Sequence, residues 1–142
     1  MKKILVSACL LGVPCRYDGK SKPNSDVIAL GNEYELIPVC PECLGGLSTP
    51  RLPAEIQGER VIRIDGVDVT MEYNLGAEKA LEIAKSNGVS IAVLKSKSPS
   101  CSKGQIYDGT YTRTLINGKG ITACLLEKND IKVIDENELE KL

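Results

Sequence analysis

Short apolar runs spaced along the chain are the feature that most restricts how it can fold. Four of them predict buried strands, at residues 4–8, 35–39, 90–94 and 131–134, because short continuous apolar runs bounded by turn signals are typical of strands covered on both faces. Helical patterns lie between them, at residues 70–86 and 121–128. Strands that alternate with helices predict an α/β fold, a three-layer sandwich with a mostly parallel, Rossmann-like sheet.

Smaller elements are expected between these. Residues 25–30 predict a short helix, whereas residues 41–57 contain too many Gly and Pro residues to predict regular structure. Residues 60–69 alternate around an Asp-Gly pair, which predicts a small β-hairpin. Residues 107–120 carry several turn signals and predict a loose hairpin or a lid.

Length and charge restrict the class of protein. A chain of 142 residues has the usual size of one domain, so we expect a single domain over residues 1–142. A net charge of −1 with interleaved signs offers no surface for a nucleic-acid polymer. No apolar run approaches the roughly 20 residues that span a bilayer, and the N-terminal run is too short for a signal peptide. We therefore expect a cytoplasmic protein that acts on a small molecule.

Cysteine content is the unusual feature of the composition. The chain has six Cys and no His, and in a reducing cytoplasm such thiols are more often metal-binding or catalytic than disulfide-bonded. Cys9, Cys40 and Cys101 each follow a predicted strand. Ligands of such sheets bind beyond the carboxyl ends of the strands, so the fold itself would bring these three thiols together.

Three thiolates suit a [4Fe–4S] cluster with one iron free of protein ligands, which could act as a Lewis acid on a soft substrate atom. A zinc site made by Cys9, Cys15, Cys40 and Cys43 is the main alternative. The Cys-x-x-Cys pair of Cys40 and Cys43 also fits a thiol redox protein, although the Leu-Gly-Gly that follows is a poor start for the helix such pairs open. Cys124 lies on a predicted helical stripe and is expected to pack in the core.

Three separated groups of motifs, in order along nearly the whole chain, carry a resemblance to a known family. They are SACLLG at 7–12 with CRYDG at 15–19, CPE at 40–42 with GG at 45–46 and PR at 50–51, and KSPSC at 97–101. The chain resembles the 2-thiouracil desulfidases, long described as domain of unknown function 523. The resemblance implies a Rossmann-like α/β fold, a [4Fe–4S] cluster on the cysteines that match Cys9, Cys40 and Cys101, and non-redox removal of sulfur from a thiolated pyrimidine.

The resemblance also implies catalytic roles for the acidic residue of the CPE motif and for a serine of the SPSC motif, which match Glu42 and Ser98. Glu42 would act as general base on a water that attacks the thiocarbonyl carbon, and Ser98 would shuttle a proton or orient the substrate. The alternatives are a carboxylate that caps backbone N–H groups and ordinary turn chemistry before a proline. Cys43 departs from the family pattern, which leaves open whether a fourth thiolate reaches the cluster.

Polar residues in the same loops complete the predicted site. Arg16, Asp18 and Arg51 would either bind the substrate or brace the loops through ion pairs. Two other classes of protein use only part of this set: a metal-binding module needs neither Glu42 nor Ser98, and a thiol redox protein needs only the Cys-x-x-Cys pair.

Overall fold

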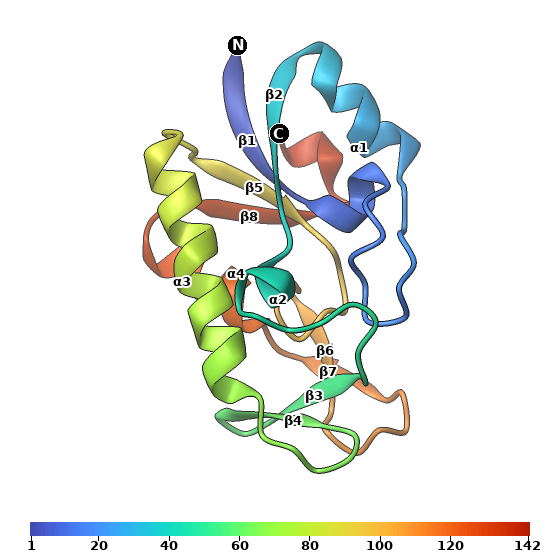
Figure 1. Cartoon of the computed structure of the whole chain (residues 1–142). Helices are drawn as coiled ribbons and strands as arrows, with labels where there is room; N and C mark the ends of the chain where they lie inside the picture. Colours follow the sequence, from blue (N-terminus) through green and yellow to red (C-terminus); the bar gives the residue numbers. More distant parts are fainter.

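Four parallel strands form the central sheet of the computed structural model, which describes residues 1–142. β1 (Lys2–Ser7) lies between β2 (Tyr34–Val39) and β5 (Ile91–Leu94), and β8 (Lys132–Asp135) pairs with β5 at the edge. The order is therefore β2-β1-β5-β8, with every pair parallel (Figure 1). The four predicted strands are confirmed, each within two residues of its predicted ends.

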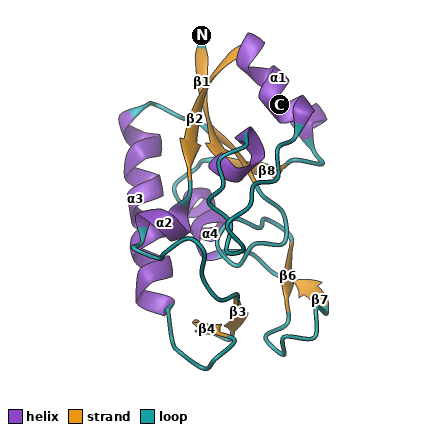
Figure 2. Ribbon diagram, turned by 45° about the vertical axis from the view of Figure 1, so that its right-hand side comes forward, coloured by secondary structure: helices purple, strands orange, loops and turns teal.

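Helices cover both faces of this sheet (Figure 2). Side chains of β1 alternate between the faces: Leu5 packs with α3 (Thr70–Ser86) and α4 (Ile121–Lys128), while Ile4 and Val6 pack on the opposite face. That second face is covered by shorter elements, namely α1 (Ser25–Ala29) with η2 (Leu30–Asn32), η1 (Ala8–Leu11) and η3 (Leu139–Lys141). The predicted three-layer α/β arrangement is confirmed. None of the helices has the length and apolar character needed to cross a membrane.

A crevice opens between the carboxyl ends of β1 and β5. The chain leaves β1 toward α1 on one face and leaves β5 toward α4 on the other. Adjacent parallel strands whose connections depart to opposite faces leave a gap at their carboxyl ends, and such gaps bind ligands in open α/β sheets. The Ser7 Oγ accepts a hydrogen bond from the Lys95 backbone N–H at 2.9 Å, which ties the two strand ends together at this point.

Two antiparallel hairpins lie beyond this edge of the sheet, at the lower end of the molecule in Figure 1. One consists of β3 (Ala54–Gln57) and β4 (Arg60–Arg63), and the other of β6 (Gln105–Tyr107) and β7 (Leu115–Asn117). The second agrees with the hairpin predicted over residues 107–120.

The expectation for residues 41–57 was wrong, and the hairpin predicted over residues 60–69 is present in a short form. Residues 41–57 contain a one-turn helix, α2 (Pro41–Leu44), and strand β3. A proline suits the first turn of a helix, where its missing N–H has no partner to lose, and the later prolines fall between α2 and β3 rather than within either. β4 pairs with β3, the strand before it. Across the Asp-Gly turn it also forms an antiparallel bridge between Ile62 and Asp68, flanked by hydrogen bonds from the Arg63 N–H to the Val67 carbonyl oxygen and from the Val69 N–H to the Val61 carbonyl oxygen.

Backbone contact between α2 and α3 sets the position of the short helix. A Cβ on Gly45 would lie 1.9 Å from the Glu72 carbonyl oxygen, and a Cβ on Gly76 would lie 1.9 Å from the Pro41 carbonyl oxygen. No side chain fits at either position, so two glycines allow the helices to touch. Because α2 follows Cys40 directly, this contact also positions the residues at the end of β2.

We expect Gly76→Ala to destabilise the protein by about 2–3 kcal/mol, because the added methyl group must push α2 away from α3. In an ordinary helix interior the same change stabilises by about 1 kcal/mol, so the sign of the effect is diagnostic. Urea unfolding measures it. Gly104→Ala is the control, since a Cβ there meets no atom within 4 Å and should change stability little. A stabilised Gly76→Ala protein would contradict the close approach.

Candidate functional site

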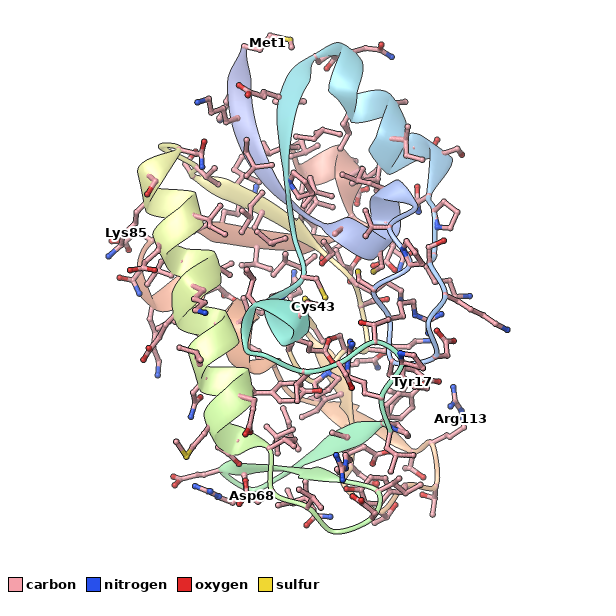
Figure 3. The ribbon with its side chains drawn as sticks, viewed as in Figure 1. Met1, Tyr17, Cys43, Asp68, Lys85 and Arg113 are labelled. Atoms are coloured by element: carbon pink, nitrogen blue, oxygen red, sulfur yellow. The ribbon has the colours of Figure 1, made fainter.

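A cavity of about 520 Å³ lies at the carboxyl edge of the sheet, between the strand ends and the two hairpins. This volume is within the range of small-molecule sites. Tyr17 and Arg113, both labelled in Figure 3, line it from loops far apart in the sequence. The predicted crevice is thus a formed pocket with an outer wall that the hairpins supply.

Three cysteines from three strand ends line this cavity. Cys9 lies in η1 just after β1, Cys40 follows β2 as the residue that caps α2, and Cys101 lies in the loop after β5. Cys9 and Cys101 are buried and Cys40 is half-buried. The structure therefore brings together the three thiols that the strand pattern pointed to.

These thiols resist ionisation in the metal-free protein. Burial raises the pKa of Cys9 to about 11 and the pKa of Cys101 to about 12, and the neighbouring Cys40 adds to both shifts. A hydrogen bond with Cys15, together with burial, raises the pKa of Cys40. Metal ligation requires thiolates, and three thiolates in one buried place require compensating positive charge. The donor set therefore fits a metal group that is bound through thiolates.

The thiols considered for a zinc site also lie near one another. Cys40 makes side-chain hydrogen bonds with both Cys15 and Cys43, although no group of three or more His, Cys, Asp or Glu side chains lies close enough to hold one metal ion. The zinc site considered from Cys9, Cys15, Cys40 and Cys43 therefore stays an alternative hypothesis. Cys9, Cys40 and Cys101, from three strand ends, would hold a cluster through three thiolates.

The remaining cysteines lie elsewhere or make other contacts. The Cys40 and Cys43 Sγ atoms lie 3.8 and 4.0 Å from the Cys15 carbonyl oxygen. Cys15 lines the cavity, and a hydrogen bond with Cys40 lowers the pKa of the Cys15 thiol. Cys43 is exposed near Thr49, at the place labelled in Figure 3. Contrary to expectation, the Cys-x-x-Cys pair does open a helix, since Cys40 caps α2.

The core position predicted for Cys124 was wrong, because this side chain is only half-buried. The buried residues of α4 are Thr122, Ala123 and Leu126. The buried face of α4 therefore points away from Cys124 and includes Thr122. Because threonine is polar, the pattern of apolar residues in the sequence does not identify it as buried.

Glu42 reaches the cavity from α2. Its Oε2 accepts a hydrogen bond from the Tyr73 hydroxyl at 2.7 Å and lies 3.3 Å from Arg51 Nη2. Burial, and then the Glu42 carboxylate, raises the pKa of Tyr73 well above its ordinary value, so the phenol keeps its proton. The carboxylate makes no hydrogen bond to a backbone N–H, so it does not serve as a backbone cap.

Ser98 lines the cavity and shapes the turn that carries Cys101. Its Oγ accepts hydrogen bonds from the backbone N–H groups of Ser100 at 3.1 Å and Cys101 at 3.0 Å. These two bonds fix the oxygen and leave its proton free to donate. Ser98 thus makes the local turn contacts expected of such a serine and also presents a hydroxyl donor to the cavity.

The three polar loop residues have different surroundings. Arg16 lines the cavity, while Asp18 lies outside its lining and forms an ion pair with Arg16 at 3.6 Å. The Arg51 side chain is only 7% exposed and donates to the carbonyl oxygens of Cys15 at 3.0 Å and Ser48 at 3.1 Å. Arg51 therefore braces two loops, whereas Arg16 is one of several cations that line the cavity.

Sequence reasoning missed Lys95 and the tyrosines. Lys95 directly follows β5 and lines the cavity, with Glu136 as its ion-pair partner at 3.1 Å; its strand-end position was a signal that could have identified it. Four of the five tyrosines of the chain line the same cavity. These are Tyr17, Tyr73, Tyr107 and Tyr111. They come from separate elements, and no local pattern marks them.

Comparison with known proteins gives three matches. A family model described as 2-thiouracil desulfurase matches residues 4–138. YbbK of Bacillus subtilis (strain 168), described as uncharacterized, is 43% identical over 149 residues, covering 98% of this chain and 99% of YbbK. The solved structure of TudS, a [4Fe–4S]-dependent thiouracil desulfidase, is 47% identical with a TM-score of 0.95, covering 100% of this chain and 95% of that chain.

Serine substitutions test which thiols hold iron. We expect Cys9→Ser, Cys40→Ser and Cys101→Ser each to abolish iron and sulfide binding after anaerobic reconstitution, because the hydroxyl is a poor substitute for a thiolate on a sulfur-rich cluster. Cys124→Ser is the control and should bind iron normally, since its side chain lies outside the cavity lining. Retention of iron in Cys101→Ser together with its loss in Cys43→Ser would show that the third ligand is Cys43.

Proposed function

Because this chain belongs to the 2-thiouracil desulfurase family, we propose that it removes sulfur from a thiolated pyrimidine such as 2-thiouracil. The reaction is a hydrolysis without net redox change: the thiocarbonyl and water give the oxo-pyrimidine and hydrosulfide. The observation that carries the proposal is the meeting of three strand-end thiols with Glu42 in one cavity.

Cys9, Cys40 and Cys101 are the proposed ligands of a [4Fe–4S] cluster. When bound, such a cluster supplies an iron atom without a protein ligand, a Lewis acid suited to the soft thiocarbonyl sulfur. The support for this ligand set is the convergence of three thiols from three strand ends on one cavity. Cys9 and Cys101 are buried and Cys40 is half-buried, and electrostatic interactions are stronger in such partly desolvated surroundings than in water.

Glu42 is the proposed general base. Its carboxylate takes a proton from the water that adds to the ring carbon, and the carbon–sulfur bond breaks as the carbon–oxygen double bond forms. Support comes from its place in the cavity lining and from its side chain being only 16% exposed. Ser98 is proposed to orient the substrate or donate a proton, since its oxygen is fixed by two backbone N–H groups and its own proton remains free.

Arg16 is the proposed substrate-binding cation of the cavity, oriented by its ion pair with Asp18. Arg51 contributes by bracing, because its guanidinium already bonds the loops around Cys15 and Ser48. A planar heterocycle would meet the tyrosine side chains on the outer wall, and rings of this kind stack favourably. The proposed partner is therefore a small thiolated pyrimidine.

We further propose that residues 1–142 act as one iron–sulfur-binding domain in the cytoplasm. All six cysteines are free, and unpaired thiols and an oxygen-sensitive cluster suit a reducing compartment. Cell fractionation with detection of the chain in the cytoplasmic fraction tests this placement.

Anaerobic reconstitution should load the protein with about four irons and four sulfides and produce the broad visible absorption of a thiolate-held cubane. Iron and sulfide determination on the same sample gives the stoichiometry. Tight stoichiometric zinc without iron uptake would support a zinc-binding module in place of the proposed enzyme.

Glu42→Gln should keep the cluster and the fold but slow desulfuration of 2-thiouracil by about 10²- to 10⁴-fold, the usual contribution of a positioned proton transfer. Ser98→Ala should show a smaller loss. The measurements are hydrosulfide release and loss of thiocarbonyl absorption, with iron content determined on the same samples.

Glu78→Gln is the matched control, since Glu78 is exposed on α3. A wild-type rate in Glu42→Gln would remove this residue from the mechanism. A fully loaded wild-type protein with no activity on any thiolated pyrimidine would leave only a metal-binding role.

A further inference from the structure

The two oxygen atoms of Glu42 have different surroundings. Oε2 accepts the Tyr73 hydroxyl at 2.7 Å and lies 3.3 Å from Arg51 Nη2. Oε1 has no hydrogen-bond partner in the protein, and it is not among the buried polar atoms that lack one. Since Glu42 lines the cavity, the arrangement leaves one oxygen bound by the protein and the other available there.

The tyrosine that binds Oε2 is rigidly held. Tyr73 is only 3% exposed and packs with Val61 and Val69. One turn farther along α3, Gly76 makes the backbone contact with α2. Glu42 lies on α2 and Tyr73 lies on α3, so this contact between the two helices fixes the distance between the phenol and the carboxylate. Neither helix can shift without breaking the contact.

The second group on Oε2 is held equally firmly. The Arg51 guanidinium donates to the Cys15 carbonyl oxygen, the Ser48 carbonyl oxygen and Thr49 Oγ1 at 3.0–3.1 Å. The loops that carry Cys15 and Ser48 thus fix the position of the Arg51 guanidinium charge beside Glu42. Tyr73 and Arg51 approach the carboxylate from different parts of the chain, and both contact Oε2.

We propose that Tyr73 is a positioning residue for desulfuration: with Arg51 it holds Oε2 of Glu42, so that Oε1 is the atom that takes the proton from water. This inference rests on the proposed function, in which Glu42 is the general base. The terminal torsion of a glutamate side chain is soft and has no sharply preferred rotamer. Without the phenol, the carboxylate samples orientations in which Oε1 points away from the reacting water.

Tyr73 itself has no proton to give to the substrate. Its hydroxyl already donates to Glu42, and the side chain is buried against Val61 of β4 and Val69, the residue before α3. Its contribution therefore passes through the carboxylate, which distinguishes it from Ser98, whose proton is free.

Tyr73→Phe removes only the hydroxyl and keeps the packed ring. We expect kcat for 2-thiouracil to fall by about 10- to 100-fold, the loss of one hydrogen bond to a charged group, with KM changed by less than about twofold because substrate binding is untouched. Iron content should equal that of the wild type. Tyr34→Phe is the matched control, since Tyr34 begins β2 at the opposite end of the sheet and its hydroxyl makes no hydrogen bond.

A double substitution shows whether Tyr73 acts through Glu42. Once Glu42→Gln has removed the base, adding Tyr73→Phe should lower kcat no further. A crystal structure of Tyr73→Phe should show the Glu42 carboxylate turned or in several orientations, with the cysteines unmoved.

The outcomes separate the two levels of the proposal. A wild-type kcat in Glu42→Gln would overturn the assignment of the base, and with it this inference. A slow Glu42→Gln combined with a wild-type kcat in Tyr73→Phe would overturn this inference alone. Additive losses in the double variant, or an unmoved carboxylate in the crystal structure, would also overturn it.

Discussion

Parallel pairing of β1 with both β2 and β5 is the constraint on which the rest of the molecule depends. Because all four strands run the same way, their carboxyl ends meet at one edge, and residues that are distant in sequence become neighbours there. The hydrogen bond from the Lys95 N–H to Ser7 Oγ links β1 and β5 at that edge. Each of the three proposed iron ligands is attached to a different strand end, so the sheet determines their convergence before any metal binds.

Burial gives the sulfur end of the cavity its chemical character. Desolvation disfavours thiolates, which is why the pKa of Cys9 and the pKa of Cys101 rise to about 11 and 12. A site of this kind is costly to ionise when empty and becomes favourable when metal cations compensate the charge. The same exclusion of water strengthens the interactions of Glu42 with Tyr73 and Arg51. Burial therefore affects both the proposed iron ligands and the proposed base.

The hairpins complete the site by closing its outer side. The Glu55 carboxylate, buried on β3, accepts hydrogen bonds from the backbone N–H groups of Gly109 at 3.0 Å and Tyr111 at 3.1 Å. The Tyr111 hydroxyl in turn donates to the Ile62 carbonyl oxygen on β4. One hairpin therefore holds the loop of the other, and Tyr107, Tyr111 and Arg113 line the same cavity as the three cysteines.

The layers, the four strands and the edge where three cysteines meet could be predicted from the sequence, because apolar periodicity and strand-end position are local properties of the chain. The folded chain alone sets the orientation of Glu42, since Tyr73 lies 31 residues away and its place depends on two glycines that let α2 touch α3. It also decided that Cys124 faces partly outward, because the rotation of a short helix follows from what packs on it. Contacts between distant elements leave no periodic pattern in a sequence, so they become visible only when the chain is folded.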